Sequence, residues 1–282
     1  MKRYVIKVEY VGKKYSGSQL QGGQGRVAPV TIQSELEKAL STLIGGNSKK
    51  KDAFDSKSGK SYGNPTGNTC KSQDNKKRIK TIFSGRTDKG VNSKGQIVHF
   101  ETDRTLVASK FIYSMNEILP ADISLSSDFG LKEVTNDFHA QKSAKKRHYQ
   151  YVFYNKEQRS AFDGGLLLIK WNLDVQRMQQ SLEYLQGEHD FSSFRSSGST
   201  TLNKICFIYK VECKKLDDMV VIDIVGNRFL YNMVRAIVGT LLLIEKNNLP
   251  PEAMKCILEA RDRSKAGKTV SPLGLTLMKV EY

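Results

Sequence analysis

The chain has 282 residues, of which 39% are apolar and 9% aromatic, so it can bury a substantial core in one large domain or in two smaller ones. Its formal charge of +16 favours a polyanionic partner. Neither the four cysteines nor the four histidines have the spacing of a metal site or of a disulfide framework. No long apolar run and no signal-peptide pattern is present, so we expect a soluble protein of a reducing compartment, without a membrane segment.

The first elements that the pattern predicts are a strand and a helix. Apolar and polar residues alternate from Arg3 to Val11, which is typical of a half-buried strand. Apolar residues then recur at helical spacing from Ile32 to Ile44, with Thr31 as the expected N-cap. The glycine-rich run 22–28 contains Gly-x-Gly-x-x-Ala, but it does not connect a strand to a helix, so we interpret it as a loop and not as a nucleotide-binding turn.

The segment 46–80 differs in composition from its surroundings. It holds ten lysines and arginines against three aspartates and is otherwise rich in Ser, Gly, Asn and Thr. Its few apolar residues cannot offset the entropy lost on ordering, so we predict a mobile, lysine-rich insertion. The lysine runs could contact RNA or act as a nuclear targeting signal, although a solvated charge run is the simpler interpretation.

A polar loop with a single carboxylate, Asp88, lies between predicted strands at 79–83 and 97–100. A loop of about a dozen residues is longer than a hairpin needs, which indicates a function. Its cations are Arg86, Lys89 and Lys94. Neighbouring positive charge lowers the pKa of a carboxylate, and an ionised carboxylate suits a nucleophile. The alternative is that Asp88 and the nearby Gly90 form an ordinary turn.

The remaining elements repeat one order along the chain. We expect helices at 111–119, 175–185, 230–244 and 252–260, and strands at 123–134, 147–154, 205–213, 219–225 and 274–282. Each half then reads strand, helix, strand, strand, helix, strand, which is the split βαβ pattern of ferredoxin-like domains. We therefore predict an α+β fold of two related ferredoxin-like βαββαβ halves, 1–135 and 136–282. They should form a mixed, mainly antiparallel sheet with helices on one face and a basic cleft between the halves.

The residues from Gly85 to Val91, Gly-Arg-Thr-Asp-Lys-Gly-Val, resemble the signature loop of the tRNA pseudouridine synthase A family, Gly-Arg-Thr-Asp-Ala-Gly-Val-His-Ala. Further segments resemble other blocks of this family in the same order. They are Val8–Gly12, Val30–Gln33, Phe138–Ala140, Ser143–Tyr151, Leu185–Phe194, Phe229–Gly239 and Arg261–Tyr282. Ordered matches over nearly the whole chain argue against chance.

The resemblance implies an isomerase that converts uridine to pseudouridine in tRNA, with positions 38 to 40 of the anticodon arm as the family's usual target. This reaction breaks the glycosidic bond, turns the uracil and joins its carbon to the same ribose, without a metal, a redox step or another cofactor. It needs an ionised carboxylate at the ribose, a group that handles a proton, an apolar pocket for the base and cations for phosphates.

By the same resemblance, Asp88 is the catalytic residue and four other residues bind the substrate. Tyr149 is expected to stack on or bond to the target nucleotide, and Arg86 to help displace the target base. Arg235 is a single cation in an apolar helix, where a buried guanidinium needs a carboxylate partner, and the resemblance implies that this partner is Asp88. Leu275 is expected beside the uracil. Without the resemblance, these four could be a core tyrosine, a phosphate-binding arginine, an arginine that reaches solvent and a core leucine.

The sequence departs from the family pattern at several places. Asn92-Ser93 stands where the family usually has His-Ala, and Ser18-Gln19 where it usually has Trp-Gln. The lysine-rich insertion is not typical of compact bacterial members. These departures affect the surface that positions RNA, and therefore the choice of uridine, rather than the presence of the catalytic residues.

A different class of function is compatible with the same composition. A basic α+β protein could hold structured RNA without reacting with it, as an inactive relative that serves as an RNA chaperone. The presence of Asp88, Tyr149 and Arg235 together favours the enzyme. The family likeness further implies tRNA as the partner, a homodimer, no small-molecule cofactor and a cytoplasmic location, or an organelle or the nucleus if a targeting segment has been removed.

Overall fold

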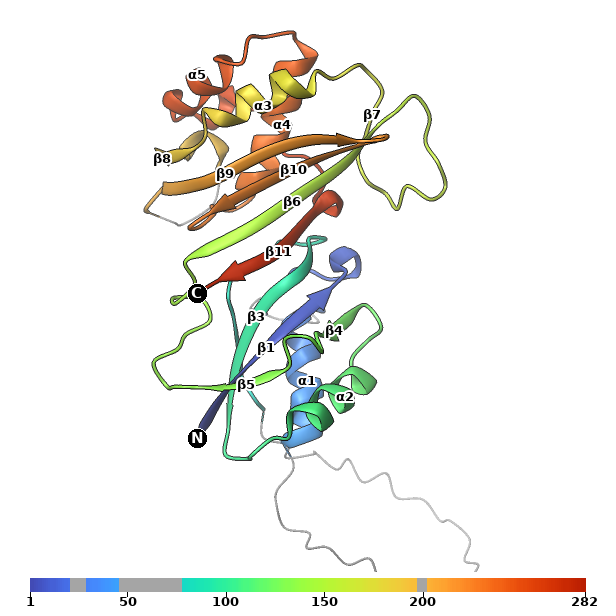
Figure 1. Ribbon diagram of the computed structural model, residues 1–282, viewed down its shortest axis with the longest axis vertical. Helices are drawn as coiled ribbons and strands as arrows, with labels where there is room; N and C mark the ends of the chain where they lie inside the picture. Colours follow the sequence, from blue (N-terminus) through green and yellow to red (C-terminus); the bar gives the residue numbers. More distant parts are fainter. Residues whose placement is uncertain (21–28, 46–77, 197–201) are drawn as a thin grey trace, which may run out of the picture.

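The computed structural model describes residues 1–20, 29–45, 78–196 and 202–282, and Figure 1 shows their arrangement. In these residues five α-helices accompany an eleven-stranded sheet with the strand order β4-β1-β3-β11-β6-β10-β9-β8. Strands β2, β5 and β7 pair with β3, β1 and β6, respectively. Most pairs are antiparallel, and only β11 with β3 and β6 with β7 run parallel among the described strands. The predicted α+β class with a mixed, mainly antiparallel sheet is confirmed.

The N-terminal part of the sheet packs against two helices. Its elements are β1 (Lys2–Tyr10), α1 (Ile32–Ile44), β2 (Thr81–Phe83), β3 (Asn92–Thr102), α2 (Ala108–Ile118), β4 (Ile123–Leu125) and β5 (Leu131–Val134). The predicted cap of α1 is present, because the Thr31 hydroxyl accepts a hydrogen bond from Ser34 N at 3.1 Å and Ser34 Oγ accepts one from Thr31 N at 2.9 Å. Such a reciprocal cap satisfies amide groups that the first helical turn leaves free.

The C-terminal part contributes the other six strands and three helices. Its elements are β6 (Lys146–Asn155), β7 (Leu168–Ile169), α3 (Val175–Glu183), β8 (Gly187–Asp190), β9 (Ile205–Leu216), β10 (Met219–Gly226), α4 (Met233–Lys246), α5 (Ala253–Ala260) and β11 (Leu275–Glu281). Asp174 caps α3, as its sequence position predicts, by accepting hydrogen bonds from Gln176 N and Arg177 N at 3.0 Å. Strands β7 and β8 were not predicted, because each is too short to show a period.

The last strand of the chain joins the two parts of the sheet. Figure 1 shows β11 between β3 and β6, and it pairs in parallel with the first and antiparallel with the second. Thr276 and Leu277 face Asn92 and Ser93 of β3 in this register. The start of β3, which follows the Asp88 loop, therefore lies directly beside β11 of the C-terminal part.

Two expected elements differ in the structure. The predicted strand 123–134 is two strands, because residues 126–130 turn, with Gly130 at a φ of +69° that favours glycine. The polar loop is shorter than expected, since β3 begins at Asn92 and leaves only 84–91 between the strands. Ser93 pairs with Tyr10 of β1 and with Leu277 of β11, so partners distant in sequence extend this strand.

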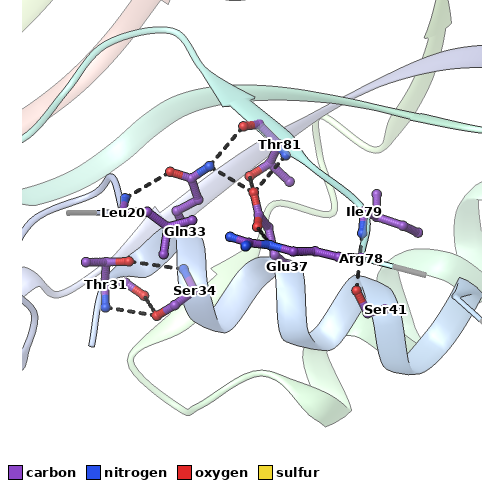
Figure 2. A network of polar contacts seen from close by, with 9 residues as sticks. All are labelled: Leu20, Thr31, Gln33, Ser34, Glu37, Ser41, Arg78, Ile79 and Thr81. Atoms are coloured by element: carbon purple, nitrogen blue, oxygen red, sulfur yellow. Dashed lines mark hydrogen bonds and ion pairs between the residues drawn. The ribbon is translucent and has the colours of Figure 1, made fainter. Parts of the chain in front are cut away.

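A buried carboxylate attaches the start of β2 to α1, as Figure 2 shows. Glu37 is 4% exposed, and it accepts hydrogen bonds from Thr81 N at 2.9 Å, Thr81 Oγ1 at 3.0 Å and Arg78 Nε at 2.8 Å. The side chain of Gln33 extends the network, because it donates to Glu37 at 2.8 Å and accepts from Leu20 N at 3.0 Å. This network fixes the strand that leads into the Asp88 loop.

Two predictions fall mainly on parts that the structure does not describe. The glycine-rich run 22–28 lies outside the described residues, as does 46–77 of the predicted insertion 46–80. None of the described helices has both the length and the apolar character needed to cross a membrane.

Candidate active site

A pocket of about 920 Å³ lies where the N-terminal and C-terminal parts of the sheet meet. Its described walls come from the loop 84–91, the segment 141–142, strand β6 and the residues 228–234 that lead into α4. Four of the five predicted site residues line this pocket, namely Asp88, Arg86, Tyr149 and Leu275. The fifth, Arg235, lies on α4 and is not part of the described lining.

The carboxylate of Asp88 is largely removed from water but faces the pocket. Burial raises its pKa above the usual 3.8, and the positive charge of Arg235 opposes this shift. No other described residue forms a hydrogen bond or an ion pair with the carboxylate. The expectation that the cations of the loop lower its pKa is therefore wrong, because desolvation by burial is the larger effect and the charge that opposes it belongs to Arg235. A carboxylate with little solvation and no fixed partner is available to react.

Arg235 has contacts other than the expected ion pair. Its Nε donates to the carbonyl of Val270 at 2.8 Å, and its Nη1 donates to Asn232 Oδ1 at 2.6 Å. Among the described residues it forms no ion pair with Asp88, and the two groups interact only through their charges. Its neighbours Val234 and Ile237 are buried, as expected.

Tyr149 points into the pocket from strand β6. Its side chain is 8% exposed, and the ring of Phe229 meets its ring edge-on at a centroid distance of 5.1 Å. Burial raises the pKa of its hydroxyl above the usual 10, with further contributions from Tyr10 and Asp88, so the hydroxyl is neutral and can donate a proton in a hydrogen bond. No described residue bonds to this hydroxyl, which leaves it free for a ligand.

Arg86 and Leu275 line the pocket in different ways, one as an exposed charged residue and the other as a buried apolar residue. Arg86 is exposed, and its Nε donates to the side-chain oxygen of Gln19. Leu275 is 5% exposed, begins β11 and pairs with Tyr151 of β6, so it is at once a core residue and part of the pocket. The cations in the described lining are Arg86, Lys89, Lys142, Arg147 and Arg228. They stand against a single carboxylate, so the pocket suits an anionic ligand with an apolar portion.

Arg147 has a structural role that its place in the sequence did not predict. Its guanidinium donates to four backbone carbonyls, those of Ser84 and Gln141 at 3.0 Å, Ala144 at 3.1 Å and Asn227 at 2.6 Å. These carbonyls belong to the Asp88 loop, to the segment before β6 and to the loop before α4. The one signal in the sequence was an arginine two positions before Tyr149, which places both on the same face of a strand.

The structure is that of an α+β protein with a cationic pocket between the two parts of its sheet. Comparison with known sequences shows which family it belongs to. A family model described as tRNA pseudouridine synthase matches residues 182–282. Proteins named tRNA pseudouridine synthase A are similar over the whole chain. The protein of Colwellia psychrerythraea is 34% identical over 281 residues, which cover 99% of this chain and 93% of that protein. One from Thermoanaerobacter sp. is 33% identical over 283 residues and covers both chains completely. One from Coxiella burnetii is 36% identical over 275 residues, with 96% and 92% covered.

This chain belongs to the tRNA pseudouridine synthase A family, so the expectation from the signature loop is confirmed. Among solved structures, one titled as the crystal structure of a Cbf5-Nop10-Gar1 complex matches 59% of this chain and covers 36% of its own, with a TM-score of 0.29 and 13% identity, a likeness too weak to inform the fold.

Proposed function

We propose that the pocket around Asp88 is the active site in which this tRNA pseudouridine synthase isomerises uridine. Membership of the family supports an isomerase that acts on tRNA. The observation that carries the assignment of the site is the state of Asp88, a desolvated carboxylate without a bonded partner among the described residues, at the wall of a pocket lined by five cations and apolar side chains. The cations of the pocket suit the phosphates that flank the target ribose, and its apolar side chains suit the base once it is removed from water.

Each site residue has a role that follows from its surroundings. Asp88 acts at the ribose as the nucleophile, and its poor solvation makes the carboxylate more reactive than in water. Arg235 contributes the positive charge that keeps enough of this group ionised. Tyr149 offers a neutral hydroxyl and a ring face to the nucleotide, and Leu275 gives the uracil an apolar surface. Arg86, exposed at the rim, contacts the RNA and helps to displace the target base.

The reaction conserves the composition of the nucleotide, although the C5 hydrogen exchanges with water. The bond from the ribose C1′ to uracil N1 breaks with its electron pair going to the base, a carboxylate oxygen of Asp88 bonds to C1′, and the base turns within the pocket. Its C5 then bonds to C1′ and displaces the Asp88 carboxylate with the electron pair of the O–C1′ bond, the hydrogen on C5 leaves as a proton, and N1 takes up a proton. Asp88 as a base that first removes a proton from the ribose is the competing role for the same residue.

The substrate position and the assembly belong to the same proposal. We assign the target to the anticodon arm, at positions 38 to 40, and the cationic pocket to a basic cleft between two related ferredoxin-like halves, 1–135 and 136–282. The family likeness supports a homodimer with tRNA as partner and a cytoplasmic location. An RNA chaperone without activity is the alternative, and no feature of the pocket favours it.

Mapping the modified nucleotide tests the substrate assignment. We would incubate the protein with a tRNA transcript that has uridine at positions 38, 39 and 40, and with a matched transcript that has cytidine there. Chemical marking of pseudouridine followed by primer extension should give stops only in the first transcript and only at those positions. Stops outside the anticodon arm would show that the assigned target is wrong while leaving the reaction intact.

A further inference from the structure

The loop that carries Asp88 is held from its inner side by a chain of buried side chains. Ser84 Oγ donates to the side-chain oxygen of Gln96, and Gln96 Nε2 donates to Tyr10 Oη at 3.2 Å and to the carbonyl of Gly85 at 2.9 Å. Tyr10 Oη in turn lies 2.8 Å from Thr87 Oγ1. Strand β1 supplies Tyr10 and strand β3 supplies Gln96, so the core of the sheet contacts the loop through these groups.

The Tyr10 hydroxyl takes part in two of these contacts at once. The amide nitrogen of Gln96 donates to Tyr10 Oη, so the tyrosine oxygen accepts there, and between Tyr10 Oη and Thr87 Oγ1 either hydroxyl can be the donor. Tyr10 is 4% exposed, and burial raises the pKa of its hydroxyl to about 12, so the hydroxyl keeps its proton at any physiological pH. A buried chain of satisfied hydrogen bonds fixes the position of the residue at its end.

Thr87, the residue directly before Asp88, receives this support together with two backbone contacts. Its N–H donates to Ser18 Oγ at 2.8 Å, and its carbonyl accepts from Ser18 N at 3.0 Å. Both Thr87 and Ser18 are buried. With its hydroxyl, amide and carbonyl all bonded, Thr87 fixes the direction in which the next side chain leaves the backbone.

We infer that Tyr10 is a positioning residue for Asp88, which acts through Thr87 and does not touch the substrate. The inference deepens the proposed function and rests on it for its effect on turnover. Loss of the Tyr10 hydroxyl leaves the buried Thr87 hydroxyl without this partner and releases the loop. A carboxylate displaced by a fraction of an ångström reacts more slowly, although the pocket still binds RNA.

The test compares two tyrosines of the same strand. Tyr10→Phe removes the hydroxyl beneath the loop. Tyr4→Phe is the matched control, because Tyr4 is 3% exposed on the same side of β1, and its hydroxyl lies at the far end, where it accepts from Leu106 N at 3.3 Å and donates to the carbonyl of Arg104 at 3.5 Å. Pseudouridine formation in tRNA is measured at saturating and at limiting tRNA, well below the melting temperature of each variant.

We expect kcat of Tyr10→Phe to fall about 10- to 100-fold, with KM for tRNA within about threefold of the parent, and Tyr4→Phe to stay within about twofold in both. Thr87→Val should reproduce the loss, Thr87→Ser should retain most of the activity, and Tyr10→Phe with Thr87→Val should lose no more than either alone, because both remove the same contact. Equal kcat values for Tyr10→Phe and Tyr4→Phe, or additive losses in the double variant, would overturn the inference.

A second measurement separates this inference from the proposed function. Deuterium uptake in the peptide that covers 84–91 should rise in Tyr10→Phe and not in Tyr4→Phe, whether or not the protein is active on a given tRNA. Unchanged uptake in Tyr10→Phe would contradict the positioning role. If uptake increases in Tyr10→Phe but the parent protein forms no pseudouridine, the result supports the positioning role and contradicts only the proposed function.

Discussion

Arg147 Nη2 donates a hydrogen bond of 3.0 Å to the carbonyl oxygen of Ser84, and this contact joins strand β6 to the first residue of the loop that carries Asp88. The same guanidinium also binds the carbonyls of Gln141 and Asn227, so one side chain holds three segments of the pocket wall. No described carboxylate pairs with it, and the carbonyl dipoles alone compensate its charge. The shape of the pocket therefore depends on this arginine.

Replacement of Arg147 by lysine should reduce both activity and stability. Lysine keeps the charge but cannot reach four carbonyls, so we expect about 2 kcal/mol lower free energy of unfolding and at least about tenfold lower kcat. Arg3→Lys is the control, since Arg3 also donates to backbone carbonyls, those of Asn136 and Phe138, but lies outside this pocket. Equal loss of kcat in both variants, measured by single turnover and urea unfolding, would show that the effect is general destabilisation.

For two tyrosines on one face of β6, loss of the hydroxyl should have different effects, one on activity and the other on stability. Tyr149 has no described partner for its hydroxyl, whereas Tyr151 donates to the carbonyl of Ser271 at 2.8 Å. Tyr149→Phe should therefore lower kcat about 10-fold or more with little change in melting temperature. Tyr151→Phe should cost about 1 kcal/mol in stability with little change in kcat. The reverse pattern would show that Tyr151, and not Tyr149, contacts the substrate.

The charge of Arg235 should affect the acid limb of the profile of kcat/KM against pH. Burial raises the pKa of Asp88 and Arg235 lowers it, so kcat/KM should fall as the pH drops through a value above 3.8. Arg235→Leu removes the opposing charge, and the limb should then move to higher pH. Arg235→Lys keeps the charge and should leave the limb near that of the parent. A limb that does not move in Arg235→Leu would mean that Asp88 and Arg235 are not coupled.

The stability of the protein should depend on the ionisation of Asp88 with a definite sign. The raised pKa means that the folded state binds this proton more tightly than the unfolded state, so ionisation costs stability as the pH rises through the folded pKa. Asp88→Asn should thus be as stable as the parent or more stable at pH 7, and this difference should close in acid. Thermal unfolding from pH 3 to pH 8 measures it.

Asp262 provides the control of opposite sign. The hydroxyl of Ser264 lowers the pKa of Asp262 by hydrogen bonding to its carboxylate. Asp262→Asn should therefore be no more stable than the parent at pH 7. A loss of stability at pH 7 in Asp88→Asn would indicate that Asp88 is a structural residue rather than a reactive one.

Local patterns predicted the parts of the structure that depend on local interactions. Thr31 and Asp174 cap their helices as their positions indicate, because a cap involves only the next few residues. The length of β3 was underestimated, since its first residues pair with Tyr10 and Leu277, which are remote in sequence. Strand pairing over such distances leaves no periodic signal.

In the candidate site, too, the sequence predicted local features but not those that depend on residues distant in the chain. The signature loop predicted Asp88 as the catalytic residue, but the direction of its pKa shift depends on burial in the folded chain, which spacing cannot reveal. Likewise, the isolated cation in α4 suggested a direct ion pair, whereas Arg235 is satisfied by Asn232 and by a backbone carbonyl. Buried polar groups need partners, but the sequence does not say which ones.

Release of tritium tests most directly whether this protein makes pseudouridine with Asp88. tRNA transcribed with 5-tritiated uridine is incubated with the parent protein and with Asp88→Asn, and the label freed into water is counted. The C5 hydrogen leaves only when C5 becomes the glycosidic carbon, so we predict release by the parent and a loss of at least about 1000-fold in Asp88→Asn, with tRNA binding nearly unchanged. Release by Asp88→Asn at a rate comparable to the parent, or no release by the parent from any tRNA that it binds, would contradict the account.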